Sequence, residues 1–208
     1  MTRSKTSKAW LREHVSDVYV QRARHEGYRS RAAYKLQEIA RSDRLIASGM
    51  TVLDLGAAPG GWSQVAAELV GSKGRVIAVD LLEMQPVRAV VFIQGDLRDA
   101  TTVARLEAEL RTAPVDLVVS DMAPNISGIA MSDQARALQL AEMALDFAIK
   151  WLKPGGNFLV KTFQGAGFPG LRDAMRRHFR QVLTRKPRAS RGRSSEVYLL
   201  GKGLIGKA

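Results

Sequence analysis

The sequence contains no cysteine among its 208 residues, which excludes disulfide bonds, thiol nucleophiles and cysteine-based metal sites. It also contains no apolar run that approaches the length of a membrane span. The basic start, MTRSKTSKAWLREH, is not followed by the apolar core of a secretory signal. Together these absences predict a protein of the reducing cytoplasm that does not associate with a membrane.

What is present indicates an ordinary globular protein. Hydrophobic residues make up 46% of the chain and charged residues 25%, and the length suits one domain with a sizeable core. We expect residues 1–29, which are polar and basic, to form a partly helical N-terminal arm. Residues 30–208 are expected to form the folded domain. We expect a monomer that uses no metal ion.

The net charge of +12 is unevenly distributed. Residues 1–50 carry 11 Lys and Arg against 5 Asp and Glu, residues 51–169 carry 10 against 13, and residues 170–208 carry 11 against 2. A slightly acidic centre between two strongly basic ends favours a core that performs chemistry and flanks that bind a polyanion. We therefore predict nucleic-acid binding. The predicted phosphate contacts are Arg29, Arg31 and residues 188–193.

Hydrophobic periodicity predicts alternating strands and helices. The expected strands are residues 51–55, 75–79, 90–93, 115–120, 157–161, 181–185 and 196–200. The expected helices are residues 30–40, 62–70, 101–110, 132–152 and 168–179. Ser30 and Ser132 are expected to cap two of these helices, and the KPGG stretch is expected to end the long one.

This alternation implies an α/β fold with a mostly parallel sheet. About ten residues join the last two expected strands, which is short for a helical crossover, so these strands should pair antiparallel. The predicted fold is therefore a seven-stranded, mostly parallel sheet with one antiparallel strand and helices on both faces. This is the arrangement of the Rossmann-like S-adenosylmethionine-dependent methyltransferases.

The stretch VLDLGAAPGGWSQ predicts a cofactor-binding turn. A strand that includes Asp54 leads into small residues and then into a helix, and in such sheets ligands bind at the carboxyl ends of the strands. The glycines, Gly60 among them, let the backbone approach a ligand closely. Trp62 could pack near that ligand or simply in the core. The turn does not have the GxGxxG pattern of dinucleotide-binding proteins.

Acids follow the next two expected strands at the same sheet edge. Asp80 comes 19 residues after Gly61, where a carboxylate can accept hydrogen bonds from both ribose hydroxyls of an adenosine. Asp96 could meet the adenine amino group. Either acid could instead cap a helix or form a turn, but three consecutive strands with acids at one edge favour an adenosine cofactor. S-adenosylmethionine suits the turn better than NAD, because no pyrophosphate fingerprint is present.

The stretch VVSDMAPN places Asp121 at the same edge. Methyltransferases that act on base amines often have Pro-Pro-aromatic here, and this sequence lacks that aromatic residue, which argues against amine chemistry. Lys161 follows an apolar strand, FLV, where an unpaired ammonium would be costly. With Lys35 and Glu196 these residues could form an alternating cluster of two lysines and two acids.

Such a cluster suits a hydroxyl nucleophile, which is weak until its proton is removed or its oxyanion is stabilised. A lysine that is neutral part of the time, because a second lysine and partial burial disfavour its charged form, can accept that proton. Lys35 alone could be a solvated helix residue and Glu196 alone a strand-edge charge. Lys161 is harder to explain structurally.

With these residues in place, the chain resembles the FtsJ/RrmJ (RlmE) family of ribose 2'-O-methyltransferases. The resemblance rests on SRAAYKL, DLGAAPGGWSQ, DMAPN, FLVKTFQG and SSEVYLL, and it covers nearly the whole chain. It implies a catalytic tetrad of Lys35, Asp121, Lys161 and Glu196, with Lys161 as the proton acceptor. The cofactor contacts that it implies are Gly60, Trp62, Asp80, Asp96 and Asp121.

The resemblance also implies S-adenosyl-L-methionine as the cofactor and a uridine in the A-loop of 23S rRNA, on the large ribosomal subunit, as the substrate. Related members act on tRNA anticodon loops or mRNA caps, and the basic ends do not separate these substrates. A non-catalytic RNA-binding factor for ribosome assembly and an adenine-amine methyltransferase are the alternatives from other classes.

Overall fold

The computed structural model describes residues 17–111, 114–124, 127–190 and 194–206. Its helices are α2 (Val18–Glu26), α3 (Ala33–Asp43), α4 (Gly61–Val70), the 3-10 turn η1 (Gly71–Lys73), α5 (Ala100–Leu110), α6 (Ala130–Trp151) and α7 (Phe168–His178). Its strands are β1 (Thr51–Leu55), β2 (Arg75–Asp80), β3 (Val90–Gln94), β4 (Val115–Ser120), β5 (Leu152–Phe163), β6 (Phe179–Arg185) and β7 (Glu196–Leu204).

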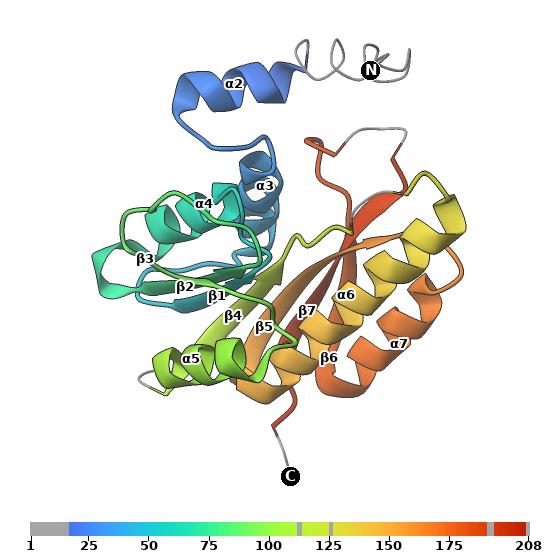
Figure 1. The fold of residues 1–208 in the computed structure, drawn as a ribbon. Coiled ribbons are helices and arrows are strands. Elements are labelled where there is room, and N and C mark those ends of the chain that lie inside the picture. The colour runs from blue at the N-terminus through green and yellow to red at the C-terminus, as the bar shows by residue number, and fades with distance from the viewer. Residues whose placement is uncertain (1–16, 112–113, 125–126, 191–193, 207–208) are drawn as a thin grey trace.

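The strands form one seven-stranded sheet in the order β3-β2-β1-β4-β5-β7-β6 (Figure 1). All pairs from β3 to β5 are parallel, whereas β7 runs antiparallel to both β5 and β6. The predicted sheet, with a single antiparallel strand, is therefore confirmed. Because β7 alone runs the other way, it begins at the edge where the parallel strands end.

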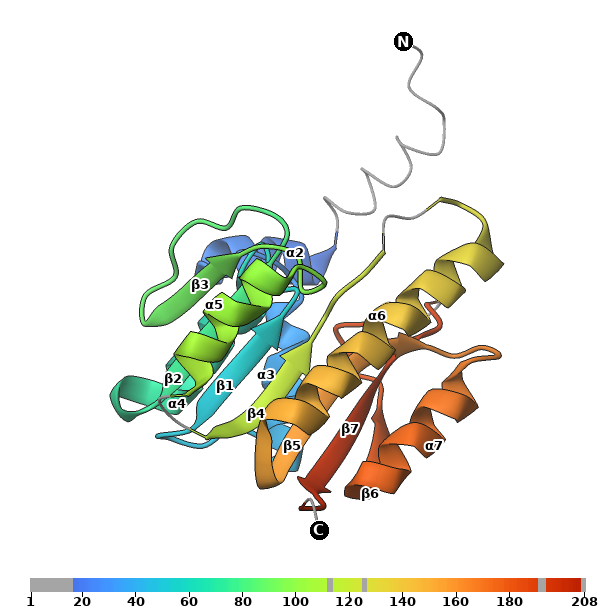
Figure 2. The ribbon, with the colours of Figure 1, turned by 60° about the horizontal axis from the view of Figure 1, so that its bottom comes forward.

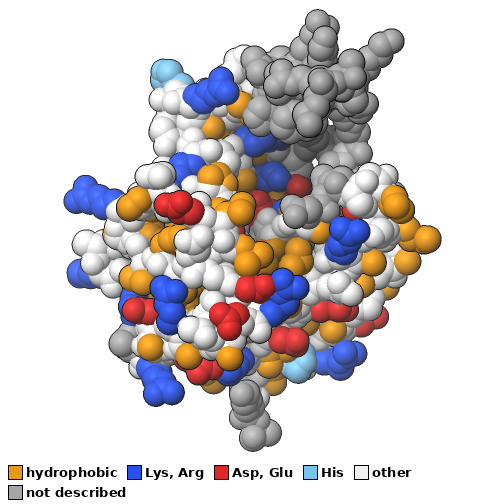
Figure 3. Space-filling model, in the orientation of Figure 1, with side chains coloured by type: hydrophobic (Ala, Val, Ile, Leu, Met, Phe, Trp, Pro, Cys, Tyr) orange, Lys and Arg blue, Asp and Glu red, His pale blue; other side chains and the backbone are white. Residues whose placement is uncertain are grey.

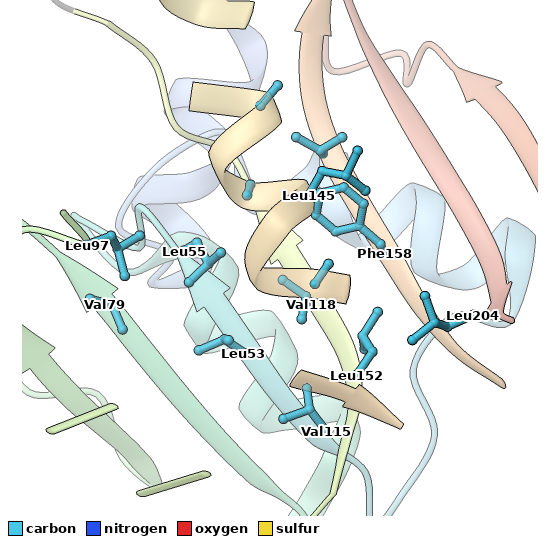
Figure 4. Packing of buried hydrophobic residues seen from close by; sticks show 14 of the residues in the cluster. Leu53, Leu55, Val79, Leu97, Val115, Val118, Leu145, Leu152, Phe158 and Leu204 are labelled. Atoms are coloured by element: carbon cyan, nitrogen blue, oxygen red, sulfur yellow. The ribbon is translucent and has the colours of Figure 1, made fainter. Parts of the chain in front are cut away.

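Helices cover both faces of the sheet, as Figures 1 and 2 show: α3 and α4 lie on one face, and α5, α6 and α7 lie on the other. Alternate residues of β1 serve the two layers, because successive side chains of a strand point to opposite faces. Leu53 and Leu55 pack with α5, α6 and α7 (Figure 4), and Val52 packs with α3 and α4. All five residues of β1 are buried, which explains why three of them are Val or Leu although the strand also contains Thr51 and Asp54.

Several helix boundaries differ from the prediction. Ser30 does not cap α3, which begins after Ala32 without a side-chain cap hydrogen bond. Ser132 does not cap α6 but lies inside it, and its hydroxyl accepts a hydrogen bond from Arg136. The cap preference of serine is a local signal, and here the chain enters each helix at a point set by packing instead.

The N-terminal arm is only partly within the described residues, because residues 1–16 lie outside them. The helix in its remaining part, α2, is capped by Asp17, whose side chain accepts from the backbone N–H of Tyr19, and ends at Gly27 in the left-handed conformation. The division of the chain at residue 29 stays a prediction. No helix in the described ranges is long and apolar enough to cross a membrane.

The fifth strand is longer than predicted, and this places Lys161 differently. We expected the strand to end at Lys161, but β5 continues to Phe163 along β7. Its parallel partner β4 ends at Ser120, opposite Val160. Lys161 is therefore the first residue of β5 beyond the end of β4, and it still pairs with Tyr198 of β7.

Replacing Phe158 by alanine should destabilise the fold strongly. Its ring is fully buried and stacks on Phe179 with 6.1 Å between ring centroids. We expect the free energy of unfolding, measured in urea, to fall by about 3–5 kcal/mol. Met131→Ala is the control, because this side chain is 83% exposed and its loss should change stability by less than about 0.5 kcal/mol. Equal effects of the two substitutions would contradict this packing.

Candidate active site

Lys161, near the carboxyl end of β5, and Asp121, directly after β4, lie next to each other. The ammonium Nζ of Lys161 lies 3.1 Å from Oδ1 of Asp121 and also donates to the backbone carbonyl of that residue. The side chain of Lys161 is only 8% exposed. The lysine that looked misplaced in an apolar strand therefore has two oxygen partners, which offset the cost of burying its charge.

Lys35 and Glu196, the other two residues of the predicted cluster, form a second ion pair. Nζ of Lys35, on α3, donates to Oε1 of Glu196 across 2.7 Å, and both side chains are largely buried, at 12% and 15% exposed. Glu196 is the first residue of β7, so the antiparallel strand delivers it to the edge where Asp121 lies. All four residues of the predicted tetrad thus converge on one end of the sheet.

A tyrosine joins the two ion pairs. The hydroxyl of Tyr198 donates to Oδ1 of Asp121 at 2.9 Å and lies 3.4 Å from Oε1 of Glu196. The five side chains form a continuous polar chain in the order Lys161, Asp121, Tyr198, Glu196 and Lys35. We call it the charged relay of the site. A cavity of about 230 Å³ opens beside its far end, lined by Arg31, Lys35, Ser194 and Glu196.

The surroundings of the relay determine the protonation states of Glu196 and Tyr198. Burial alone would raise the pKa of Glu196, but the nearby ammonium of Lys35 and the hydrogen bonds from Lys35 and Ser190 hold that pKa below its ordinary value. Burial and the neighbouring carboxylates of Asp121 and Glu196 raise the pKa of Tyr198 well above its ordinary value. At neutral pH Glu196 is thus an anion and Tyr198 a neutral hydrogen-bond donor.

Sequence reasoning missed Tyr198 and Ser190. The signal for Tyr198 was available, because it follows Glu196 by two residues and side chains at that spacing share one face of a strand. Ser190 offered no such signal. Its hydroxyl donates to Oε1 of Glu196 at 2.8 Å from a turn that only the folded chain brings there.

The predicted cofactor turn lies between β1 and α4, next to the relay. Gly56 and Gly60 both have positive φ, 78° and 106°, which explains glycine at these positions. A Cβ on Gly60 would come within 2.9 Å of the Met84 sulfur and 3.0 Å of a guanidinium nitrogen of Arg29. One side of this turn is therefore packed against protein, and the backbone is the part that remains for a ligand.

Arg29 has protein partners around this turn. Its guanidinium donates to the carbonyl oxygens of Pro59, Gln85 and Pro86, and so fastens the segment between β2 and β3 to the glycine turn. Arg31 forms an ion pair with Asp17 and donates to the carbonyl of Ala189. The structure thus gives both predicted phosphate contacts a role in holding segments together.

The predicted adenosine-binding acids lie near the turn with partners of their own. One oxygen of Asp80 accepts from the backbone N–H of Ala58 at 2.9 Å and the other from Leu82 at 2.8 Å. Asp96 forms an ion pair with Arg98. A carboxylate oxygen has a second lone pair, so these bonds still leave acceptors for ribose hydroxyls or an amino group.

Trp62 is 3% exposed, and its indole N–H donates to the carbonyl of Ala32 at 2.8 Å. Its ring lies 5.7 Å from that of Tyr198. The ring therefore packs beneath the relay, and any direct contact with a cofactor falls to the backbone at the start of α4.

Asp54 is a further buried acid that was not predicted as a site residue. It is fully buried, Oδ2 accepts from the hydroxyl of Ser63 at 2.7 Å, and Oδ1 has no hydrogen-bond partner in the described part of the chain. Burial raises its pKa to about 7, against the hydrogen bond from Ser63, and the charges of Asp121 and Asp80 add to the rise.

The side chains at this edge of the sheet fit the predicted cofactor. S-adenosylmethionine carries hydroxyls, an ammonium and a sulfonium, which need hydrogen-bond acceptors and negative charge. Four carboxyl groups lie at this edge, those of Asp54, Asp80, Asp96 and Asp121. Within the described ranges no cluster of three or more His, Asp and Glu side chains is placed to hold a metal ion.

Comparison with known proteins agrees with this chemistry. Residues 28–204 match the FtsJ-like methyltransferase family. The chain is 62% identical over 203 residues to "Ribosomal RNA large subunit methyltransferase E" of Nitrosospira multiformis, covering 98% of both chains. It is 59% identical over 200 residues to the protein of that name from Neisseria meningitidis serogroup B, covering 96% of this chain and 97% of the other.

Among solved structures, a Plasmodium falciparum protein assigned as a ribosomal RNA methyltransferase has a similar fold. The TM-score is 0.78 at 29% sequence identity, over 86% of this chain and 100% of that chain.

Replacing Arg29 by glutamine should weaken binding of S-adenosylmethionine about tenfold, because the segment between β2 and β3 loses its attachment to the glycine turn and must be ordered on binding. Calorimetric titration of the free protein with S-adenosylmethionine measures this. Arg24→Gln, on the exposed end of α2, is the matched control and should bind normally. Normal cofactor affinity in Arg29→Gln, together with weaker RNA binding, would show instead that Arg29 contacts phosphate.

Asp54 should make stability depend on pH. Its pKa in the folded state is about 7, above its ordinary value, so between about pH 4 and pH 7 the folded protein holds a proton that the unfolded chain has released. The stabilisation is complete below pH 4 and is lost as the pH rises towards 7, at about 1.4 kcal/mol per pH unit. Urea unfolding of the wild type and Asp54→Asn at pH 5, 6, 7 and 8 measures the difference.

The asparagine keeps an acceptor for Ser63 but cannot ionise. The stability of the wild type relative to Asp54→Asn should therefore fall between pH 5 and pH 7 and level off above. A difference that stays constant across this range would contradict the assignment.

Proposed function

The chain belongs to the FtsJ-like methyltransferase family, as its motifs predicted, and on this premise we propose that it methylates the ribose 2'-hydroxyl of a uridine in the A-loop of 23S rRNA, within the large ribosomal subunit. The proposed cofactor is S-adenosyl-L-methionine, bound at the turn between β1 and α4. The names of the relatives, which are large-subunit rRNA methyltransferases, support rRNA as the substrate.

The observation that carries the proposal is the charged relay beside the glycine turn. Two buried lysines, each held by an acid, lie at the end of the sheet where the acids predicted to bind the cofactor also lie. S-adenosylmethionine, when bound, supplies an electrophilic methyl group. A ribose hydroxyl is too weak a nucleophile to react until it loses its proton, so a base and positive charges are the groups that this reaction needs.

Each relay residue then has a role. Lys161 acts in its neutral amine form: the lone pair of Nζ accepts the proton of the 2'-hydroxyl, and the ammonium that results is paired with Asp121. Asp121 orients Lys161 through its carboxylate and its backbone carbonyl. Glu196 and Tyr198 hold Lys35 and Asp121 in place, and the ammonium of Lys35 adds positive charge that stabilises the developing alkoxide. Alignment of the hydroxyl with the methyl group contributes the rest.

The proposed cofactor contacts are Gly60, Trp62, Asp80, Asp96 and Asp121. Trp62 contributes its backbone, since its ring is buried. The residues 191–193, which we predicted to contact RNA, lie outside the described residues. We further infer that the protein acts as a monomer in the cytoplasm, with the basic N-terminal arm close to the RNA.

Substitutions at Lys161 test the role of this residue. Lys161→Ala should bind S-adenosylmethionine normally and lower kcat by about a hundredfold to ten-thousandfold, the range of a general base. Lys161→Arg keeps a positive charge but does not release a proton at neutral pH, so it should be similarly inactive. The activity of both variants is measured as transfer of a labelled methyl group to large ribosomal subunits that lack the modification.

Lys150→Ala, an exposed lysine of α6 paired with Glu107, is the control and should be fully active. Normal turnover by Lys161→Ala would remove the residue from the mechanism, and activity restored in Lys161→Arg would replace the base by a purely electrostatic role. A wild-type protein that binds the subunit without methylating it would favour the assembly-factor alternative.

A further inference from the structure

A second hollow lies on the side of α3 that does not face the charged relay. It has a volume of about 890 Å³ and is lined by residues of α2, α3, the segment after α3 and the turn before β7. We call it the outer groove. Four of its lining residues are arginines, Arg22, Arg41, Arg44 and Arg188, and one is an acid, Glu38.

Most of this positive charge is unneutralised. Arg22 forms an ion pair with Glu26 and lies over the ring of Tyr34, 4.6 Å from its centroid. The other three arginines are exposed, and their guanidinium groups have no hydrogen bond or ion pair within the described part of the chain. Clustered basic charge in a concave surface is the feature that phosphate backbones recognise.

The outer groove is connected to the charged relay by a short turn. The backbone N–H of Arg188 donates to Oε2 of Glu38, which fixes the turn against α3, and the N–H of Ser190 closes it on the carbonyl of Pro187. Arg188 lines the groove, whereas Ser190, two residues later, donates to Glu196 of the relay. The two sites thus lie on either side of the same turn.

Figure 3 shows one face of the molecule, on which Lys and Arg side chains lie over α2 and side chains of both signs mix over the lower part. RNA carries a phosphate at every nucleotide, so the nucleotides that flank a ribose bound at Lys161 bring further phosphates to the surface around the relay.

We propose that the outer groove binds the phosphate backbone of the substrate RNA, outside the catalytic centre, through Arg41, Arg44 and Arg188. This inference rests on the proposed function, because it takes RNA as the polyanion. Apolar side chains in the groove, Ile46 and Leu69, provide surface for a sugar or base next to the phosphates. Binding here reads no sequence and instead fixes the orientation of the RNA on the enzyme.

The double variant Arg41→Gln with Arg188→Gln tests the proposal, because it removes one arginine from each wall of the groove. Its affinity for an A-loop hairpin transcript of 23S rRNA with a long flanking stem should fall about tenfold, and the dependence of log affinity on log salt should become less steep by about 1.5, the value for two phosphate contacts. Affinity for S-adenosylmethionine should not change.

Two controls separate the groove from general electrostatics. Arg177→Gln with Arg180→Gln removes the same charge from exposed positions on α7 and β6, and should change affinity by less than twofold. Arg41→Lys with Arg188→Lys retains the charge and should keep most of the affinity. A shortened transcript without the stem should bind the wild type and the groove variant alike.

Three outcomes would overturn the proposal. The groove and control variants could lose the same affinity for the transcript, the groove variant could lose the same affinity for the long and the short transcript, or it could lose no affinity at all. Loss of affinity for S-adenosylmethionine in the groove variant would also overturn the proposal, because it would show that the arginines stabilise the fold. The proposed function fails separately: if the wild type binds the transcript through the groove but methylates neither it nor the large subunit, only the catalytic assignment is wrong.

Discussion

The site depends on the hydroxyl of Tyr198, which joins the two acids of the charged relay. Asp121 and Glu196 both lie against this hydroxyl, and without a donor between them two carboxylates in a partly buried place would repel each other. The lysines at the two ends balance their charge. Breaking either ion pair would leave a buried charge without its partner, which costs more than the intact pair contributes, and removing the tyrosine hydroxyl would leave the two carboxylates without the donor between them. The relay is therefore a unit that forms as a whole.

The antiparallel strand makes this unit possible. Parallel strands alone deliver residues to the carboxyl edge only at their ends, as β4 does for Asp121. Because β7 runs the other way, its first residues, Glu196 and Tyr198, arrive at that same edge beside Lys161. The lysine and the tyrosine are paired residues of neighbouring strands, so the sheet itself sets their spacing. Arg29 and Arg31 then tie the segments around this edge to one another.

The sequence predicted a mostly parallel sheet with one antiparallel strand because strands leave strong local signals. The tetrad followed from the family resemblance, and of its members Lys161 had the clearest local signal. The centre of a buried strand such as β2 is an apolar run, and Lys161 stood out because it follows such a run in β5. The predictions were wrong where a helix boundary or the partner of a side chain depends on distant parts of the chain. Ser30 and Ser132 have the composition of caps, but packing starts both helices elsewhere. Arg29 has the charge of a phosphate contact, yet its three carbonyl partners come from segments 30 or more residues away. Only the folded chain could reveal them.

The central claim is that this relay activates a ribose hydroxyl. Its most direct test is to find the atom that receives the methyl group. Large subunits methylated with labelled S-adenosylmethionine can be digested to nucleosides, separated and identified by mass. We expect one labelled product, 2'-O-methyluridine, whose neighbouring phosphodiester bond in the RNA also resists alkaline hydrolysis. Label on a base carbon or amine, with the ribose unmodified, would contradict it.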